Sequence, residues 1–272
     1  RQRSCETASN HRILYENSMK HKYIVSRGLS IIELLFSIVI GSAILLIAAS
    51  TLVRSGDSYE QIKQRVASNR EARSAMVQIT SDLSTACYHK DSLFDRSVNY
   101  WPTDQLCFLS MKSKNSQKDS NSLGDLCLVN FYLKDLIIGG KTVRCLMRGL
   151  CESGQTFDAL KSENLSSLFK ENLNLDEPIA LGVISFEARP KIRDEDHRWI
   201  DWVKNDTISP QGLEVKLVTV RQGIMTRLKH SSDWDGINND DLKLGTPDES
   251  HENKNLEVYQ AILRFGNHAK QT

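Results

Sequence analysis

Hydrophobic positions divide the chain into three regions of different character. From Leu34 to Val53 there is no Asp, Glu, Lys or Arg. This uncharged run of 20 residues would be about 30 Å long as a helix, which is enough to cross the hydrocarbon core of a bilayer. The pattern therefore predicts a transmembrane helix over residues 29–53.

Beyond Arg54 the pattern stays helical but becomes amphipathic. No Pro interrupts the chain between Leu29 and Tyr100, and apolar residues recur at steps of three, four and seven. We expect the same helix to continue over residues 54–88 and to end near Cys87. One apolar stripe should pack on a soluble domain, and it comprises Ile62, Val66, Met76, Ile79 and Leu83.

The rest of the chain favours strands joined by short polar connections. Runs of β-branched and aromatic residues, several of them alternating with polar ones, predict half-buried strands. These runs are 105–111, 125–133, 143–150, 179–190, 212–220 and 256–265, and residues 154–169 predict a short helix. The expected fold class is α+β, with a long N-terminal α-helix, transmembrane in its first half, packed on an antiparallel β-sheet domain over residues 89–272.

Composition narrows the functional classes. Lys plus Arg number 35 against 34 Asp plus Glu, a balance that does not favour a nucleic-acid partner. No Gly-rich phosphate loop, HExxH motif or convincing Ser/His/Asp set occurs, so we do not expect an enzyme. The six cysteines form no CxxC pair, which disfavours a zinc site. Cys145 and Cys151 could form a short disulfide, or strand pairing could hold them apart.

One acidic stretch has the chemistry of a cation site. Hard oxygen donors surround Gly236 in residues 231–241, and such donors around a tight turn suit Ca²⁺. The match to an EF-hand loop is partial, because Leu242 stands where the twelfth-position acid would be. The alternative is a plain acidic surface turn. The candidate calcium ligands are Asp233, Asp235, Asn238, Asp240 and Asp241, and no other cofactor is expected.

Glu33 is the anomaly of the apolar region, because a carboxylate at the mouth of a membrane segment is costly. A cleaved secretory signal would be shorter, and a plain anchor would not explain the acid. Residues 27–34, Arg-Gly-Leu-Ser-Ile-Ile-Glu-Leu, resemble the prepilin leader junction of type IV pilins and type II secretion pseudopilins. The resemblance implies that a prepilin peptidase cuts after Gly28 and methylates Leu29, which makes Glu33 the fifth mature residue.

The same resemblance gives an expectation for the leader. Met19 begins a short basic segment that resembles the leaders of this family, so residues 1–28 would be leader and residues 1–18 a non-native or upstream extension. Pro, which major pilins carry midway along the apolar run, is absent near Ser50. That departure favours a minor component.

Later segments resemble one branch of the family. Two tryptophans, Trp199 and Trp202, precede a strand from Pro210 to Val215, as in the J-type minor pseudopilins of type II secretion. We expect these tryptophans at a protein interface, with core capping or sugar or lipid binding as the alternatives. From Arg221 onward the chain is more similar to uncharacterised prepilin-type proteins of planctomycete and verrucomicrobial genomes.

The resemblance implies a role in assembly. The expected function is a minor pilin-like subunit that initiates or enters a short type II secretion-type filament. The alternative is a minor subunit of a type IV pilus, acting in adhesion or DNA uptake. The implied partners are the prepilin peptidase, other pilin-like subunits and the assembly machinery. The chain would cross the inner membrane once, with its N-terminus cytoplasmic and its C-terminal domain periplasmic.

Overall fold

The structure is a computed structural model that divides into two compact units. The first unit extends to Ser55 and the second from Gly56 onward. The described residues are 30–97, 99–113, 117, 124–171, 176–204, 208–225, 227–235, 244–247 and 250–265. The leader, residues 1–28, lies outside this described part.

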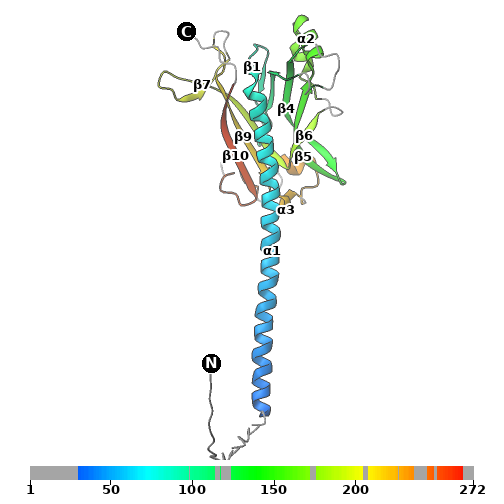
Figure 1. Ribbon diagram of the computed structural model, residues 1–272, viewed down its shortest axis with the longest axis vertical. Helices are drawn as coiled ribbons and strands as arrows, with labels where there is room; N and C mark the ends of the chain where they lie inside the picture. Colours follow the sequence, from blue (N-terminus) through cyan, green and yellow to red (C-terminus); the bar gives the residue numbers. More distant parts are fainter. Residues whose placement is uncertain are drawn as a thin grey trace, which may run out of the picture. The chain divides into compact units, whose positions relative to one another are not determined.

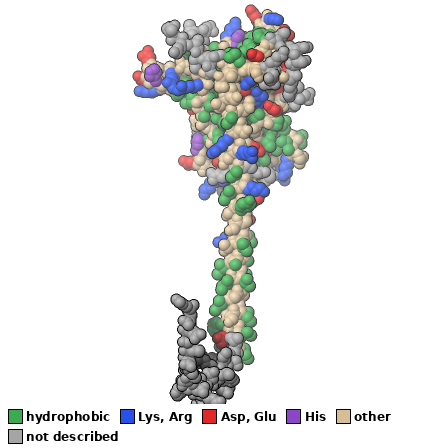
Figure 2. Space-filling model, in the orientation of Figure 1, with side chains coloured by type: hydrophobic (Ala, Val, Ile, Leu, Met, Phe, Trp, Pro, Cys, Tyr) green, Lys and Arg blue, Asp and Glu red, His purple; other side chains and the backbone are tan. Residues whose placement is uncertain are grey.

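One helix, α1 (Ile31–Ser84), contributes to both units (Figure 1). Its segment Ile31–Glu60 is long and apolar enough to cross a membrane, and the apolar side chains of that segment are exposed (Figure 2). All four hydroxyl side chains between Leu34 and Val53 donate hydrogen bonds to carbonyls of their own helix. No hydroxyl donor of this run therefore needs water, which suits a helix in lipid.

The second unit confirms the expected α+β class. A six-stranded antiparallel sheet has the order β1-β3-β4-β5-β6, and β2 also pairs with β3. Its strands are β1 (Ala86–Cys87), β2 (Leu93–Asp95), β3 (Gln105–Met111), β4 (Leu126–Ile138), β5 (Lys141–Cys151) and β6 (Glu177–Leu181). On one face it is covered by α2 (Ser153–Lys161) and η2 (Leu165–Leu168), which together replace the single helix expected over residues 154–169.

A second sheet of four antiparallel strands has the order β10-β9-β7-β8 (Figure 1). Its strands are β7 (Val183–Arg193), β8 (Trp199–Asp201), β9 (Gly212–Val220) and β10 (Leu256–Arg264). Between β9 and β10 the described residues include two short helices, α3 (Gln222–Met225) and η3 (Ser231–Asp235). The buried Asp104 links the two sheets, because its backbone N–H donates to Phe186 and its carboxylate accepts the N–H of Ala188.

One expected strand, over residues 179–190, is two strands in different sheets. Gly182 separates them with a φ of +69°, a conformation that only glycine adopts at little cost. There is also no room for a side chain here, because a Cβ at this position would lie 2.9 Å from the Met225 sulfur. This turn passes the chain from β6, beside β5, to β7, beside β9.

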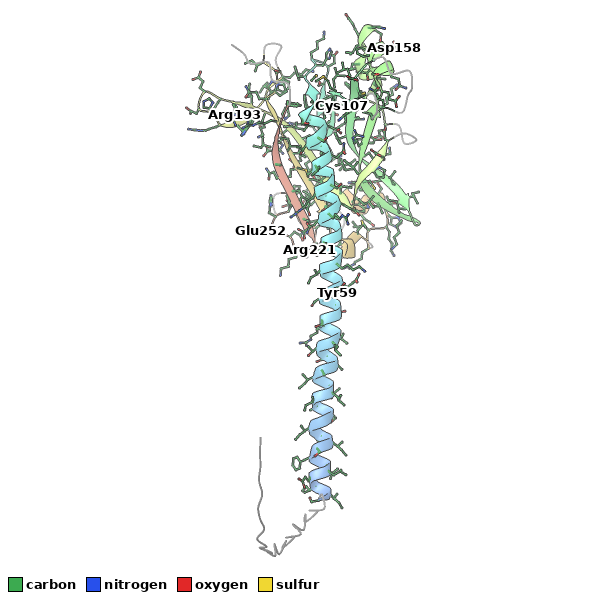
Figure 3. All side chains as sticks on the ribbon, in the orientation of Figure 1. Tyr59, Cys107, Asp158, Arg193, Arg221 and Glu252 are labelled. Atoms are coloured by element: carbon green, nitrogen blue, oxygen red, sulfur yellow. The ribbon has the colours of Figure 1, made fainter. Side chains whose placement is uncertain are left out.

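The second half of α1 packs against both sheets, but over a shorter length than its apolar pattern predicts. The first described α1 side chain that is buried is Ala72, followed by Ala75, Ile79 and Leu83. Ile62 is 61% exposed and Val66 is 59% exposed, so the prediction that they join the core stripe is wrong. Tyr59, on the same stretch of helix, is exposed as well (Figure 3).

The start of the packed part of α1 depends on how far the two sheets extend along the helix. Tyr259 of β10 hydrogen-bonds Asn69, and Glu71 accepts the backbone N–H of Leu181 in β6. Periodicity showed which side of the helix is apolar, but the residue at which the sheets meet it depends on strand lengths. The helix ends at Ser84, close to the predicted boundary.

Candidate functional site: two carboxylates on one helix

Glu33 lies in the first turn of α1. Ser30 precedes the helix, and its carbonyl accepts the backbone N–H groups of Glu33 at 3.0 Å and Leu34 at 3.1 Å. The Ser30 hydroxyl oxygen also accepts the Glu33 N–H, at 3.4 Å. The spacing Ser-x-x-Glu is that of a capping box, and a negative charge in the first turn is favourable toward the helix dipole.

Local helix capping and the helix dipole therefore favour an acid at Glu33, but they do not offset the cost of a carboxylate at a membrane boundary. Gln would serve in the same capping box without placing a carboxylate at a membrane boundary. Within the described part of the chain, nothing forms an ion pair with the Glu33 carboxylate. An isolated charge at the edge of an apolar segment is costly unless a cation or water compensates it.

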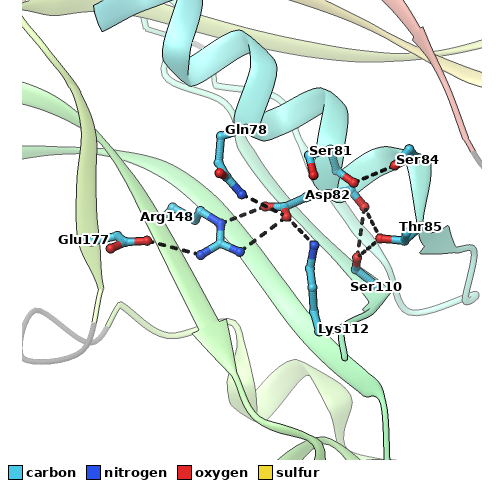
Figure 4. Close-up of polar contacts among 9 residues, drawn as sticks. All are labelled: Gln78, Ser81, Asp82, Ser84, Thr85, Ser110, Lys112, Arg148 and Glu177. Carbon is cyan, nitrogen blue, oxygen red and sulfur yellow. Dashed lines mark hydrogen bonds and ion pairs between the residues drawn. The ribbon is translucent and has the colours of Figure 1, made fainter. Parts of the chain in front are cut away.

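Asp82, in the last turns of α1, has the opposite surroundings (Figure 4). Its side chain is fully buried between the helix and the six-stranded sheet. Arg148 of β5 donates from Nε to one carboxylate oxygen at 2.7 Å and from a terminal nitrogen to the other at 3.3 Å. Lys112, just beyond β3, forms an ion pair with Asp82, and Gln78 donates to it from one turn earlier at 3.1 Å.

The backbone around Asp82 is tied to the sheet too. The Asp82 carbonyl accepts the hydroxyl of Ser110 at 2.9 Å and that of Thr85 at 3.3 Å. Glu177 of β6 accepts from Arg148 at 3.3 Å, so two carboxylates balance two cations. We call Asp82, Arg148 and Lys112 the helix clamp.

Burial and ion pairing act in opposite directions on Asp82. Burial alone would raise the pKa of its carboxyl, but the hydrogen bonds and charges of Arg148 and Lys112 outweigh it and hold the pKa below its usual value. The carboxylate is therefore charged at neutral pH. Removing Asp82 would leave Lys112 buried without its counter-charge and Arg148 with only the exposed Glu177, and such a loss is strongly destabilising in other proteins.

Sequence reasoning did not identify the helix clamp, although one signal was present. Asp82 stands between Ile79 and Leu83, on the face that the apolar spacing assigns to the core. An acid on such a face predicts a buried cationic partner. The sequence could not indicate which cation, because Lys112 and Arg148 are remote along the chain.

The structure describes only some of the sequence-predicted site residues. Gly28 and Leu29 lie outside the described residues, as do Asn238, Asp240 and Asp241. Asp233 accepts the backbone N–H groups of Lys229 at 2.8 Å and His230 at 3.0 Å, which lowers the pKa of its carboxyl. Asp235 pairs with Arg144 at 3.0 Å. These two carboxylates thus have structural partners, and calcium binding stays a prediction.

The two alternatives for Cys145 and Cys151 are resolved by β5. Both residues lie in this one strand, and six steps of roughly 3.3 Å put them on the order of 20 Å apart, too far for a disulfide. Burial raises the pKa of the Cys145 thiol to about 12 and that of Cys127 to about 11. Both thiols are therefore poor nucleophiles at neutral pH.

The two predicted interface tryptophans have different surroundings. Trp202 is buried, its ring lies against Tyr88 and Phe94, and its indole N–H donates to the Ile208 carbonyl at 2.8 Å. It therefore caps the core, the alternative that the sequence left open. Trp199 is half-buried, and the Arg193 guanidinium lies 4.8 Å from its ring centre.

Comparison with known proteins yields no relative: no family model matches the sequence, and no curated protein or solved structure is significantly similar to it. A long N-terminal apolar helix followed by a β-rich domain is compatible with a pilin-like layout. Any finer assignment depends on the motif at residues 27–34 and on the setting of Glu33.

Proposed function

We propose that this chain is a minor pilin-like subunit, or pseudopilin, that initiates or enters a short type II secretion-type filament at the inner membrane. The observation that carries the proposal is Glu33, a carboxylate with no cation among the described residues, at the start of a helix whose first half is exposed and apolar. The motif from Arg27 to Leu34 supports it independently.

Assembly would supply the missing counter-charge. Cleavage after Gly28 creates a new amine at Leu29, four residues before Glu33. In an assembled filament the amine of one subunit would pair with the Glu33 carboxylate of its neighbour, within lipid. Because burying either charge alone is costly, this pairing would favour the correct register between subunits.

The second half of α1 would contribute differently. The helix clamp fixes the helix to the sheets of its own subunit, so that a force on the first half is transmitted to a folded domain. The proposal includes a prepilin peptidase and other pilin-like subunits as partners. It assigns no catalytic step and no nucleic-acid ligand to the domain.

A matched pair of substitutions tests the proposal. Glu33→Gln keeps the side-chain length and the capping geometry but removes the charge. Asp57→Asn is the control, because Asp57 is an exposed acid of the same candidate span. Each variant would be expressed in the native host, and two quantities would be measured: the loss of residues 1–28 by intact mass, and crosslinking to other pilin-like subunits.

Processing without assembly is the expected result for Glu33→Gln, with crosslinked product reduced at least tenfold. Asp57→Asn should be processed and assembled as the wild type is. Equal crosslinking of Glu33→Gln and wild type would remove the proposed role of Glu33. Failure of the wild-type chain to be processed or crosslinked would overturn the assignment itself.

A further inference from the structure

The four-stranded sheet has one face buried against α1 and one face that carries charged side chains. Phe186 and Ala188 of β7, with Leu213, Val215 and Leu217 of β9, belong to the core that includes α1. Alternate residues of a strand point to opposite faces. The residues between them therefore face away from α1, and they are Glu187, Arg189, Glu214 and Lys216.

These four side chains form the floor of a cavity of about 560 Å³. Strand register places Glu187 opposite Lys216 and Arg189 opposite Glu214. Gln260 of β10 extends the floor, and the walls are Tyr100, Pro102, Thr246 and Pro247. The volume lies in the range of small-molecule sites, roughly 300–1,000 Å³.

The charges of this floor neutralise one another. Glu187, only 6% exposed, pairs with Arg189 and, at 3.4 Å, with Lys216. Lys191 joins Glu214 at 2.8 Å and Asp201 at 2.7 Å. The floor itself therefore carries two cations and two carboxylates, and the neighbouring Lys191 and Asp201, which do not line the cavity, add one charge of each sign. Neither an anion nor a cation would find an unbalanced charge here.

Hydrogen-bonding capacity nevertheless remains at the floor. Gln260 donates to Glu214 at 2.8 Å, and one terminal nitrogen of Arg189 donates to Glu187. A guanidinium has five N–H donors and the Arg189 side chain is 46% exposed, so Arg189 can donate further hydrogen bonds to a ligand. Each carboxylate of the floor can accept more hydrogen bonds than the contacts above provide. Donors and acceptors therefore alternate over a neutral surface.

We infer that this cavity binds a neutral carbohydrate. A sugar hydroxyl donates and accepts at once, and so matches a floor where Arg, Lys and Gln donors alternate with carboxylate acceptors. The apolar C–H surface of a sugar ring needs an apolar wall, which Tyr100 and the two prolines supply. A charged ligand would instead break the balance of the ion pairs and lose binding energy.

Saturation-transfer NMR on the full chain in lipid nanodiscs tests this inference. Nanodiscs are used because the sugar headgroups of maltoside detergents would compete with the probe sugars for the cavity. The probes are maltose, cellobiose, lactose and N,N′-diacetylchitobiose, with N-acetylneuraminic acid and glucosamine as charged comparators, each at 10 mM. At least one neutral disaccharide should show saturation transfer, and the charged comparators should show none. No signal from any neutral sugar, or signals only from charged probes, would overturn the inference.

Variants locate the site. Gln260→Ala and Tyr100→Ala should each weaken binding at least tenfold. Ile262→Ala is the matched control, because it lies on the same face of β10 and does not line the cavity. An unchanged thermal unfolding midpoint would show that each variant is folded. Unchanged binding by both cavity variants would refute this location of the site. Glu33→Gln should bind sugar as the wild type does, because this site does not depend on filament assembly.

Discussion

Glu33 and Asp82 are carboxylates on the same helix in opposite surroundings. Asp82 is buried, and its own chain provides two cations, Lys112 and Arg148, and the side-chain amide of Gln78 as partners of its carboxylate. Glu33 starts an exposed apolar segment, and the described residues provide it with no cation. The difference indicates that Asp82 serves folding within one subunit, whereas Glu33 requires a partner from outside it.

Loss of the Asp82 side chain should give the largest effect on stability. Asp82→Ala leaves Arg148 and Lys112 buried without their shared carboxylate, and we expect a loss of about 3–5 kcal/mol in the free energy of unfolding. Urea denaturation of the full chain in micelles measures it. Tryptophan fluorescence reports on the second unit, because Trp101, Trp199, Trp202 and Trp234 all belong to it.

The comparison with Glu33 provides the control. Glu33→Ala should change the free energy of unfolding, measured in the same way, by less than about 0.5 kcal/mol, as surface substitutions usually do. Equal destabilisation by both substitutions would contradict the division of roles between the two carboxylates.

Substitution of two apolar residues of α1 tests where the part of the helix that packs on the sheets begins. Ile79 is fully buried, and Ile79→Ala should cost about 2–5 kcal/mol through lost burial and a cavity. Ile62→Ala, at a position 61% exposed, should leave the domain within about 0.5 kcal/mol of wild type. The same urea titration compares them, and a large effect of Ile62→Ala would mean that the packed region begins earlier.

Acid should weaken the helix clamp selectively. The pKa of folded Asp82 lies below its ordinary value of 3.8, so the clamp stabilises the fold above that value and is lost as pH falls through the folded pKa. One such group changes the unfolding free energy by at most about 1.4 kcal/mol per pH unit. Unfolding midpoints between pH 5 and pH 2 should fall less steeply in Asp82→Asn than in wild type.

Glu33→Gln again separates the two carboxylates. Its acid profile should follow that of the wild type, since Glu33 does not contribute to the second unit. Parallel profiles of wild type and Asp82→Asn would show that the clamp carries no pH-dependent stability.

The smallest predicted effect concerns the helix start. Ser30→Ala removes the hydroxyl that accepts the Glu33 N–H, and an N-cap loss costs about 1 kcal/mol. Amide hydrogen exchange should accelerate about fivefold in the first turn of α1 and remain unchanged near Asp82. Unchanged exchange at Glu33 would mean that Ser30 does not cap the helix.

Local patterns predicted much of the fold. The strands β3 and β9 begin and end where alternation and β-branched residues placed them, at 105–111 and 212–220. Three short strands, β1, β2 and β8, were missed because two or three residues cannot show a period. The switch of sheets at Gly182 was missed because strand-favouring residues lie on both sides of this glycine, so that residues 179–190 resemble one strand.

The two carboxylates show the same limit for sites. Glu33 was identified because its signal is local: an acid beside an uncharged run, within a motif. The helix clamp depends on long-range pairing of α1 with β5 and with Lys112, just beyond β3, which no local spacing encodes. The charged floor of the four-stranded sheet was also invisible, because it exists only once β7, β9 and β10 are in register.

The most direct test of the account is the N-terminus of the chain isolated from its native membrane. Intact-mass and fragment-mass spectra should show a mature protein that starts at N-methylated Leu29, with Glu33 as its fifth residue. A chain that retains Gly28, or one cut after the apolar run near Ala49 as a secretory signal would be, would contradict the assignment as a pilin-like subunit.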